Sequence, residues 1–280
     1  MPPASSHTAV SGISAHVQRE SWTHMAAWPV SGDTFVESFA KGLSVIAAFG
    51  HERALNLTQI ARRTGLTRAT ARRLLHTLVA LGFARHDEDL FMLTPRVLQL
   101  GFAYLSTLSL RDVAQPVIES LSRAADEVVG LSVLDDLDAV YIARAEVTSV
   151  LRRPLTVGSG VPAFCTSMGR VLLAGLDPDE CASRLARAER RAWTRHTVTD
   201  ADALMDEIAR VRGQGWSLAT EQLELGACGL AVAVVDNGGK VIAALNLSTN
   251  LARHTPDILI KTFLPRLREA ADEIARQLPV

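Results

Sequence analysis

A run of arginines without any acidic residue is the part of this chain best suited to bind an anion. Between Arg53 and His86 the sequence has no Asp or Glu, whereas the whole chain is nearly neutral, with a net charge of -1. The arginines of this segment are Arg53, Arg62, Arg63, Arg68, Arg72, Arg73 and Arg85. Clustered guanidinium groups bind a phosphate backbone and release its counterions, so a nucleic acid is the expected partner. A solvated, arginine-rich helix face is the alternative interpretation of these charges.

The residues around the arginines predict two helices joined by a tight turn. Asn56 and Gln59 form a capping-box signature for a short helix over residues 57–63. After a turn that contains glycine, Thr67 caps a longer helix that runs to about Leu81. The expected buried positions of this helix are Ala71, Leu74, Leu75 and Leu78. Two helices joined in this way are typical of a helix-turn-helix.

The segments on either side extend this prediction to a winged helix-turn-helix. A first helix is expected over residues 34–49, capped by Asp33. Residues 83–93 predict a β-hairpin, the wing, with an acidic tip at 87–89. A linker helix is expected to start at Thr94-Pro95 and to run toward Leu110, because Pro suits the first helical position.

The second helix of a helix-turn-helix enters the major groove, so its first turns carry the predicted DNA contacts. The predicted DNA-binding residues are Thr67, Arg68, Thr70, Arg72, Arg73 and His76 on this helix, and Arg62 and Arg63 before it. Arg68 and Arg72 are expected to read bases, whereas the threonines and Arg62 or Arg63 hold phosphates. Helix capping is the alternative role for the threonines, and surface packing is the alternative for His76. One recognition helix reads few base pairs, so a dimer is expected, with the first helix and the linker helix as candidate contact surfaces.

From about Arg111 the pattern changes to alternating helices and strands, which predicts an α/β or α+β domain. The expected helices cover residues 113–125, 178–188, 201–212 and 256–278. The expected strands cover residues 130–134, 139–145, 226–235 and 241–248. The predicted organisation is a disordered leader (1–32), a DNA-binding domain (33–93), a linker helix (94–110) and a second domain (111–280).

The composition limits the classes of protein to consider. Cys165, Cys181 and Cys228 show no Cys-x-x-Cys spacing, which argues against a disulfide framework or a zinc module. We therefore expect a reducing, cytoplasmic compartment and no metal or cofactor. The sequence has no apolar run of transmembrane length and no secretory signal, so no membrane partner is expected.

An enzyme is the main alternative class of function, with Cys165 and Cys228 as candidate nucleophiles and His196 and His254 as candidate bases. The sequence has no Gly-x-Ser-x-Gly elbow, Walker loop or His-Glu-x-x-His helix, and no catalytic residue is predicted. A DNA-binding protein without a ligand is the second alternative. The size of the second domain argues against it, because DNA binding does not require that domain.

Five segments together resemble the IclR family of bacterial transcriptional regulators, in the branch that controls protocatechuate and p-hydroxybenzoate catabolism. The segments cover residues 39–45, 65–75, 93–98, 162–174 and 244–248. The resemblance implies an α+β protein with a winged helix-turn-helix, a linker helix and a GAF-like effector-binding domain. It also implies a homodimer or homotetramer on operator DNA and a small, aromatic carboxylic acid as effector. RNA polymerase is a further partner if the protein is an activator, and the sequence leaves activator and repressor open.

The helix start at Thr166, Ser167, Met168 and Gly169 is the best anion receptor in the second domain, because a helix N-terminus offers unpaired N–H groups. An ordinary capped helix is the alternative. The resemblance adds Glu221, Asn246 and Ser248 as effector-binding residues. It also places Ala219 where many members have aspartate, and Gly229 where some have cysteine, which implies a roomier and less negative pocket suited to an aromatic carboxylate. Arg152 and Arg153 are candidate partners of the ligand carboxylate, and a surface pair near a dimer contact is the equal alternative.

Overall fold

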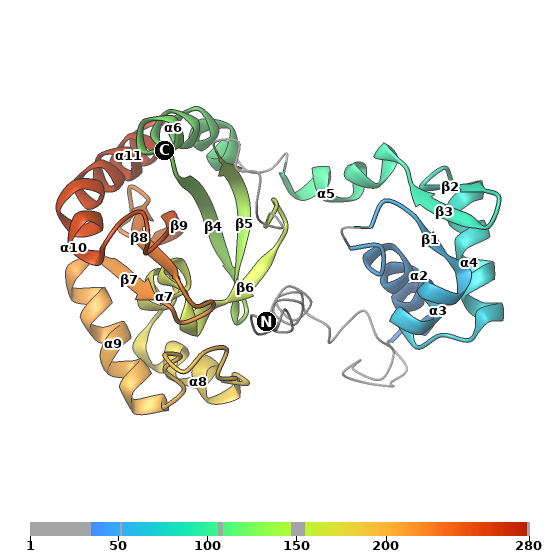
Figure 1. The fold of residues 1–280 in the computed structure, drawn as a ribbon, viewed down its shortest axis with the longest axis horizontal. Coiled ribbons are helices and arrows are strands. Elements are labelled where there is room, and N and C mark those ends of the chain that lie inside the picture. Colours follow the sequence, from blue (N-terminus) through green and yellow to red (C-terminus); the bar gives the residue numbers. More distant parts are fainter. Residues whose placement is uncertain (1–34, 51, 106–108, 147–154, 279–280) are drawn as a thin grey trace, which may run out of the picture. The chain divides into compact units, whose positions relative to one another are not determined.

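The computed structural model describes residues 35–50, 52–105, 109–146 and 155–278. These residues divide into two compact units, a smaller one before residue 108 and a larger one after it (Figure 1). The expected leader at 1–32 and the arginine pair at 152–153 lie outside the described residues.

The smaller unit contains three helices packed on a small antiparallel sheet. Its elements are α2 (Glu37–Ala47), β1 (Leu55–Asn56), α3 (Leu57–Thr64), α4 (Arg68–Ala80), β2 (Ala84–Asp87) and β3 (Leu90–Leu93). The strands lie in the order β1-β3-β2, so the hairpin β2–β3 forms the wing. This arrangement confirms the predicted winged helix-turn-helix.

Local capping signals place the two central helices where the sequence predicts them. The Asn56 side chain accepts a hydrogen bond from the Gln59 N–H (2.9 Å), and the Gln59 side chain accepts one from the Asn56 N–H (2.8 Å). Gly65 has a φ of 70°, the left-handed conformation that ends α3 at low cost. The predicted stripe of α4 is buried at Ala71, Leu75 and Leu78 and half-buried at Leu74.

The segment after the wing begins as a 3₁₀ turn (Pro95–Val97) and continues as α5 (Leu98–Leu105). The Arg96 guanidinium donates a hydrogen bond of 2.8 Å to the carbonyl of Leu81, at the end of α4. The start of the linker is therefore tied to the end of α4. Residues 106–108 lie outside the described part, and Leu110 belongs to the next helix.

The larger unit is a six-stranded antiparallel sheet covered by helices on both faces (Figure 1). The strands are β4 (Val128–Asp135), β5 (Asp138–Ala145), β6 (Gly160–Pro162), β7 (Trp216–Thr220), β8 (Ala227–Val235) and β9 (Val241–Asn250). They lie in the order β6-β5-β4-β9-β8-β7. The helices are α6 (Ser109–Ala125), α7 (Ser167–Ala174), α8 (Pro178–Arg187), α9 (Ala201–Gln214), α10 (Pro256–Ile258) and α11 (Leu264–Arg276).

Two hydrophobic cores lie on opposite faces of this sheet. Helices α6 and α11 cover one core, and α7, with α8 and α9 outside it, covers the other (Figure 1). Antiparallel strands alternate their side chains between two faces, so each strand contributes to both cores. The α+β fold class expected from the sequence is confirmed.

Three differences from the predicted elements have local causes. Strands β6 and β7 were not expected. β6 has only three residues, and in β7 the buried positions include the polar Ser217, so its sequence does not alternate between apolar and polar residues. Helix α6 begins at Ser109 and not at Val113. The C-terminal helix is divided by a π-helical segment (Leu259–Phe263), and Pro265 lies in the first turn of α11.

Candidate functional site

The exposed face of α4 carries the predicted DNA-binding side chains. Arg68, Arg72, Arg73 and His76 are exposed, on the side opposite the buried stripe. Within the described part of the chain, no carboxylate forms an ion pair with these three arginines or with the exposed Arg62 of α3. Their charges therefore remain available to a polyanion.

Thr67 is the N-cap of α4, and Thr70 in the first turn is its hydrogen-bond partner. The Thr67 hydroxyl accepts a hydrogen bond from the Thr70 N–H (3.2 Å) and donates one to the Thr70 hydroxyl (2.9 Å). Thr67 thus has the capping role that was its alternative, whereas the Thr70 side chain only accepts a hydrogen bond from Thr67. Thr67 remains exposed, so capping does not remove it from the surface that would face phosphates.

Arg63 differs from its neighbours because it makes contacts inside the small unit. Its guanidinium donates to the carbonyl of Ala48 (2.9 Å) and lies 3.4 Å from the Glu52 carboxylate. It therefore joins α3 to the end of α2. Arg62 is the more exposed candidate for a phosphate contact.

The wing contacts the recognition helix through three rings. His86 of β2 stacks on Phe91 of β3 at a centroid distance of 4.2 Å, and His76 of α4 meets the edge of Phe91 at 6.0 Å. His76 thus packs on the wing, as its alternative role predicted, while it stays exposed on the arginine face. The hairpin tip at residues 87–89 is acidic and exposed, so it would repel phosphates.

In the larger unit, α7 begins directly over the sheet. The Thr166 hydroxyl caps α7 by accepting from the Gly169 N–H (3.3 Å), and it donates to the Pro162 carbonyl (2.9 Å). Ser167 and Met168 are buried beside it. A Cβ added at Gly229 of β8 would lie 2.8 Å from the Ser167 Oγ, so the glycine allows α7 to approach the sheet closely.

Asn246 and Ser248 lie side by side on β9, facing α7. The Asn246 amide nitrogen donates to the Ser248 hydroxyl (3.0 Å), while Gly229 and Ser248 are direct partners in the β8–β9 ladder. Asn246 is 1% exposed, and no donor among the described residues reaches its Oδ1. The family motif thus selected a buried Ser167 on α7 and, on β9, a buried Asn246 bonded to a half-buried Ser248. Gly229, the ladder partner of Ser248, lies close to Ser167, and we call these three polar residues the polar group under α7.

Glu221 occupies a separate position in the turn between β7 and β8. One carboxylate oxygen accepts from the Gly226 N–H (2.8 Å), and the other lies 3.4 Å from the His196 Nε2. The residue has a φ of 54°. Its carboxylate therefore stabilises its own turn.

Two residues that sequence reasoning missed, Tyr141 and Arg144 of β5, lie on the same face as Asn246. The Arg144 guanidinium lies over the Tyr141 ring, 5.0 Å from its centroid, and the Arg144 side chain is 13% exposed. Burial raises the pKa of Tyr141, against the opposing effect of the Arg144 charge. The only sequence signal was an arginine within an otherwise apolar strand, and buried arginines need partners.

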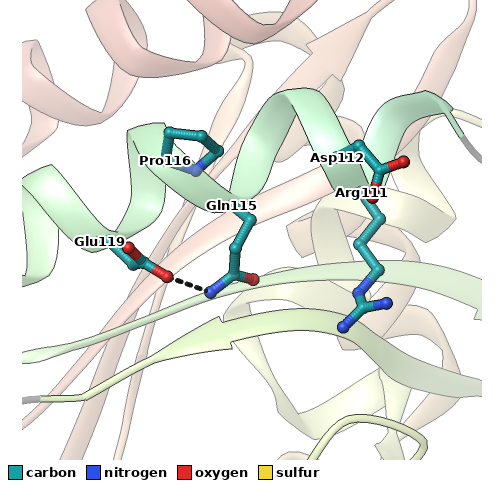
Figure 2. A pocket seen from close by; sticks show the side chains of 5 residues that line it. All are labelled: Arg111, Asp112, Gln115, Pro116 and Glu119. Carbon is teal, nitrogen blue, oxygen red and sulfur yellow. Dashed lines mark hydrogen bonds between the residues drawn. The ribbon is translucent and has the colours of Figure 1, made fainter.

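A groove of about 340 Å³ runs along α6, on the side of the sheet opposite α7 (Figure 2). It is lined by Arg111, Asp112, Gln115, Pro116 and Glu119. The Gln115 amide donates to Glu119 (2.8 Å) and, more weakly, to the backbone carbonyl of Arg144 (3.4 Å). This groove is separate from the polar group under α7, but Gln115 joins α6 to the strand that carries Arg144.

The cysteines have the properties of buried structural thiols. Burial raises the pKa of Cys165 to about 12, against the nearby charge of Arg170, and burial also raises the pKa values of Cys181 and Cys228. A protonated thiol is a poor nucleophile, which argues against a cysteine-dependent enzyme. The two candidate bases are each paired with a carboxylate, His196 with Glu221 and His254 with Glu127.

No group of three or more His, Cys, Asp or Glu side chains suited to a metal ion occurs among the described residues. Among the described helices we also find none with the length and apolar character of a membrane span.

Comparison with protein families gives a match for each unit. Residues 38–88 match the family described as the IclR helix-turn-helix domain. Residues 102–276 match the family described as the C-terminal domain of the bacterial transcriptional regulator IclR. The two matches together cover most of the chain.

Individual relatives agree with these matches. The chain is 42% identical over 246 residues to the Pca regulon regulatory protein of Pseudomonas putida, which covers 87% of this chain and 84% of that protein. It is 36% identical over 248 residues to the p-hydroxybenzoate hydroxylase transcriptional activator of Acinetobacter baylyi, which covers 86% of this chain and 92% of that protein. An IclR homologue from Microbacterium hydrocarbonoxydans, solved in complex with 4-hydroxybenzoate, has a TM-score of 0.74 and 27% identity over 85% of this chain and 98% of its own.

Proposed function

We propose, from the premise that this chain belongs to the IclR family of bacterial transcriptional regulators, that it controls a catabolic operon in response to a small aromatic acid such as protocatechuate or p-hydroxybenzoate. Family membership confirms the resemblance seen in the sequence segments. The operon and the effector are our proposal for this chain.

The exposed face of α4 carries the proposal. Arg68 and Arg72 project from the first turns of the recognition helix, where side chains meet base edges in the major groove. A guanidinium binds guanine O6 and N7 with two hydrogen bonds, so these two residues would read sequence. Arg62, Arg73 and Thr67 flank them and would hold the phosphates.

The polar group under α7 is the proposed effector site. The N–H groups of the first turn of α7, the hydroxyls of Ser167 and Ser248 and the amide of Asn246 converge there. A helix N-terminus and buried hydrogen-bonding groups suit a carboxylate. The related protein bound to 4-hydroxybenzoate supports an aromatic acid as the ligand.

The protein is proposed to act in the cytoplasm as a homodimer or homotetramer, with two recognition helices on half-sites about 34 Å apart or a multiple of that distance. RNA polymerase is a further proposed partner if the protein is an activator. The relatives are regulators, and the buried cysteines oppose an enzymatic role, so we assign no catalysis.

Fluorescence anisotropy with the full-length protein and a labelled fragment of its own upstream region tests this function. We expect binding at low salt and a change in affinity of about 5–150-fold when 4-hydroxybenzoate or protocatechuate is added. Absence of binding at low salt would contradict DNA recognition. Binding that no aromatic acid alters would contradict the effector assignment.

A further inference from the structure

We propose that Arg144 and Tyr141 belong to the effector site, that Arg144 binds the effector carboxylate, and that Asn246 accepts a hydrogen bond from a hydroxyl at the far end of the aromatic ring. The inference rests on the proposed function, because it needs an aromatic acid in the larger unit. It adds which side chains recognise each end of the ligand.

The register of the sheet places Arg144 and Asn246 on one face. Gly130 of β4 is the direct partner of Arg144 on β5 and of Asn246 on β9. Directly paired residues of an antiparallel sheet project from the same face. Ala231, the partner of Asn246 on β8, belongs to the core under α7, as does Ala244 two positions before Asn246. Arg144 therefore projects toward α7.

Gly130 forms the floor between these side chains. A Cβ added there would lie 2.5 Å from Cε1 of Tyr141 and 3.0 Å from Oδ1 of Asn246. The edge of the Tyr141 ring and the Asn246 oxygen therefore meet over the glycine. Only a residue without a side chain at position 130 allows this arrangement.

The Arg144 guanidinium interacts with the Tyr141 hydroxyl and is 13% exposed, but its Nε lacks an acceptor among the described residues. This Nε is buried, and the nearest carboxylate, Glu146, lies 3.9 Å from Nη2. Buried charges are normally paired and hydrogen-bonded, because desolvation is costly. A carboxylate on the ligand would supply the missing acceptors with fork geometry.

The unpaired Oδ1 of Asn246 needs a hydrogen-bond donor, whereas Arg144 needs an acceptor. It can only accept, and Asn246 Nδ2 is already used by Ser248. A ligand must therefore bring a donor to this end of the site. A ring hydroxyl is such a donor, whereas a second carboxylate is not at neutral pH.

The spacing of the strands sets the distance between the two ends. Strands β5 and β9 are the two neighbours of β4, so their backbones are about 10 Å apart. We propose that one benzene ring with substituents at opposite ends spans this distance. The Tyr141 ring between them offers an aromatic surface for that ring. Together these features select a hydroxybenzoate in preference to benzoate or a dicarboxylic acid.

Calorimetry on the full-length protein with three ligands tests the assignment. The ligands are 4-hydroxybenzoate, benzoate, which lacks the hydroxyl, and 4-hydroxybenzamide, which lacks the charge. We expect the wild type to bind 4-hydroxybenzoate at least about tenfold more tightly than either analogue, since each analogue leaves one buried group unpaired.

The variants separate the two ends of the ligand. Arg144→Gln should lower the affinity for 4-hydroxybenzoate about tenfold or more, and it should change the affinity for 4-hydroxybenzamide by no more than about twofold. Asn246→Leu should abolish the preference for 4-hydroxybenzoate over benzoate. Tyr141→Leu should weaken all three ligands by similar factors. The matched control is Arg187→Gln, which removes an arginine that is 62% exposed and paired with Asp136, and it should change no affinity.

Arg144→Lys keeps the positive charge but loses the two parallel N–H donors of a guanidinium. It replaces Arg144→Gln in the test if that variant fails to fold. It should lower the affinity for 4-hydroxybenzoate but not for 4-hydroxybenzamide. Wild-type affinities in whichever of these variants fold would overturn the Arg144 assignment and leave the proposed function standing. If the wild type binds DNA but no aromatic acid, the effector part of the proposed function and this inference both fail.

Discussion

At the residue scale, glycines set how closely the layers of the larger unit approach one another. A Cβ at Gly169 of α7 would lie less than 3.0 Å from the Cα, carbonyl carbon and oxygen of Ala163. Gly130 and Gly229 meet side chains, which can move, whereas Gly169 meets backbone. The start of α7, and with it Ser167, therefore depends on a glycine at position 169.

We predict that Gly169→Ala lowers the free energy of unfolding by roughly 1–3 kcal/mol, because the added methyl group must displace the backbone of Ala163. Urea denaturation monitored by tryptophan fluorescence measures the change. Gly213→Ala in α9 is the matched control, since nothing lies within 4 Å of its added Cβ and alanine favours a helix. The control should be neutral or slightly stabilising. Equal effects of the two substitutions would contradict the packing argument.

The sequence reveals Ser167, Asn246 and Ser248 as site candidates through a family motif, but it does not reveal Arg144. The register of β4 against β5 shifts between Leu131 and Ser132, so the alternation along β5 is broken. Which face Arg144 occupies depends on that irregularity, and the pattern of residues 139–145 does not show it. The pairing register between β4 and β5 therefore decides the face that Arg144 occupies, and the local sequence pattern does not reveal that register.

At the scale of elements, the starts of α3 and α4 were predictable because capping depends on residues three positions apart. Asn56 with Gln59, and Thr67 with Thr70, form the caps that their types predict. The predicted start of the first helix, capped by Asp33, was wrong, since α2 begins at Glu37 after Val36, which makes no side-chain cap. Strand β7 depends on pairing with β8 within the larger unit, and local pattern did not reveal it. Short strands are defined by their partners more than by their own residues.

The recognition helix leads to a prediction about salt. Arg68→Ala and Arg72→Ala should each abolish preference for the operator over random DNA, because base contacts carry specificity. Arg62→Ala should lower the affinity for operator and for random DNA by the same factor. It should also reduce the slope of log affinity against log salt concentration by about 0.9. Anisotropy titrations at several salt concentrations measure both effects, and calorimetry should show unchanged effector affinity. Full operator specificity in the first two variants would remove them from the groove.

Helix α6 offers a link between the proposed effector site and the linker that precedes it in the chain. Gln115, which lies on the groove face of α6 (Figure 2), contacts the backbone carbonyl of Arg144, and α6 is the first described helix after the linker. Gln115→Ala should leave effector affinity within about twofold and reduce the effector-dependent change in DNA affinity, which is typically about 5–150-fold. DNA titrations with and without 4-hydroxybenzoate measure this change. Arg123→Gln on the same helix, 71% exposed, is the control and should behave as wild type.

At the scale of the whole molecule, the two units place their charged and polar groups in opposite ways. The smaller unit keeps its arginines on the surface, where a polyanion can reach them. The larger unit holds a mostly buried arginine, a buried tyrosine and a buried asparagine under α7, which is the effector site that we propose. Mutations in one unit should therefore change the affinity for that unit's own ligand directly. They should change the affinity for the other unit's ligand only through coupling between the units.

Titration of the larger unit should limit the stability of the protein at high pH. Burial raises the folded-state pKa of Cys165 from 9.0 to about 12, and the pKa values of Cys181, Cys228 and Tyr141 are raised as well. The unfolded chain releases these protons first, so each group's contribution to stability is lost as pH rises from its ordinary pKa toward its raised folded-state pKa. For Cys165 this range runs from pH 9 to about 12. Cys165 alone should cost about 2 kcal/mol between pH 9 and about pH 10.5. Urea midpoints across this range measure the loss, and Cys165→Ala should flatten the curve. An identical pH dependence in this variant and the wild type would contradict the assignment to Cys165.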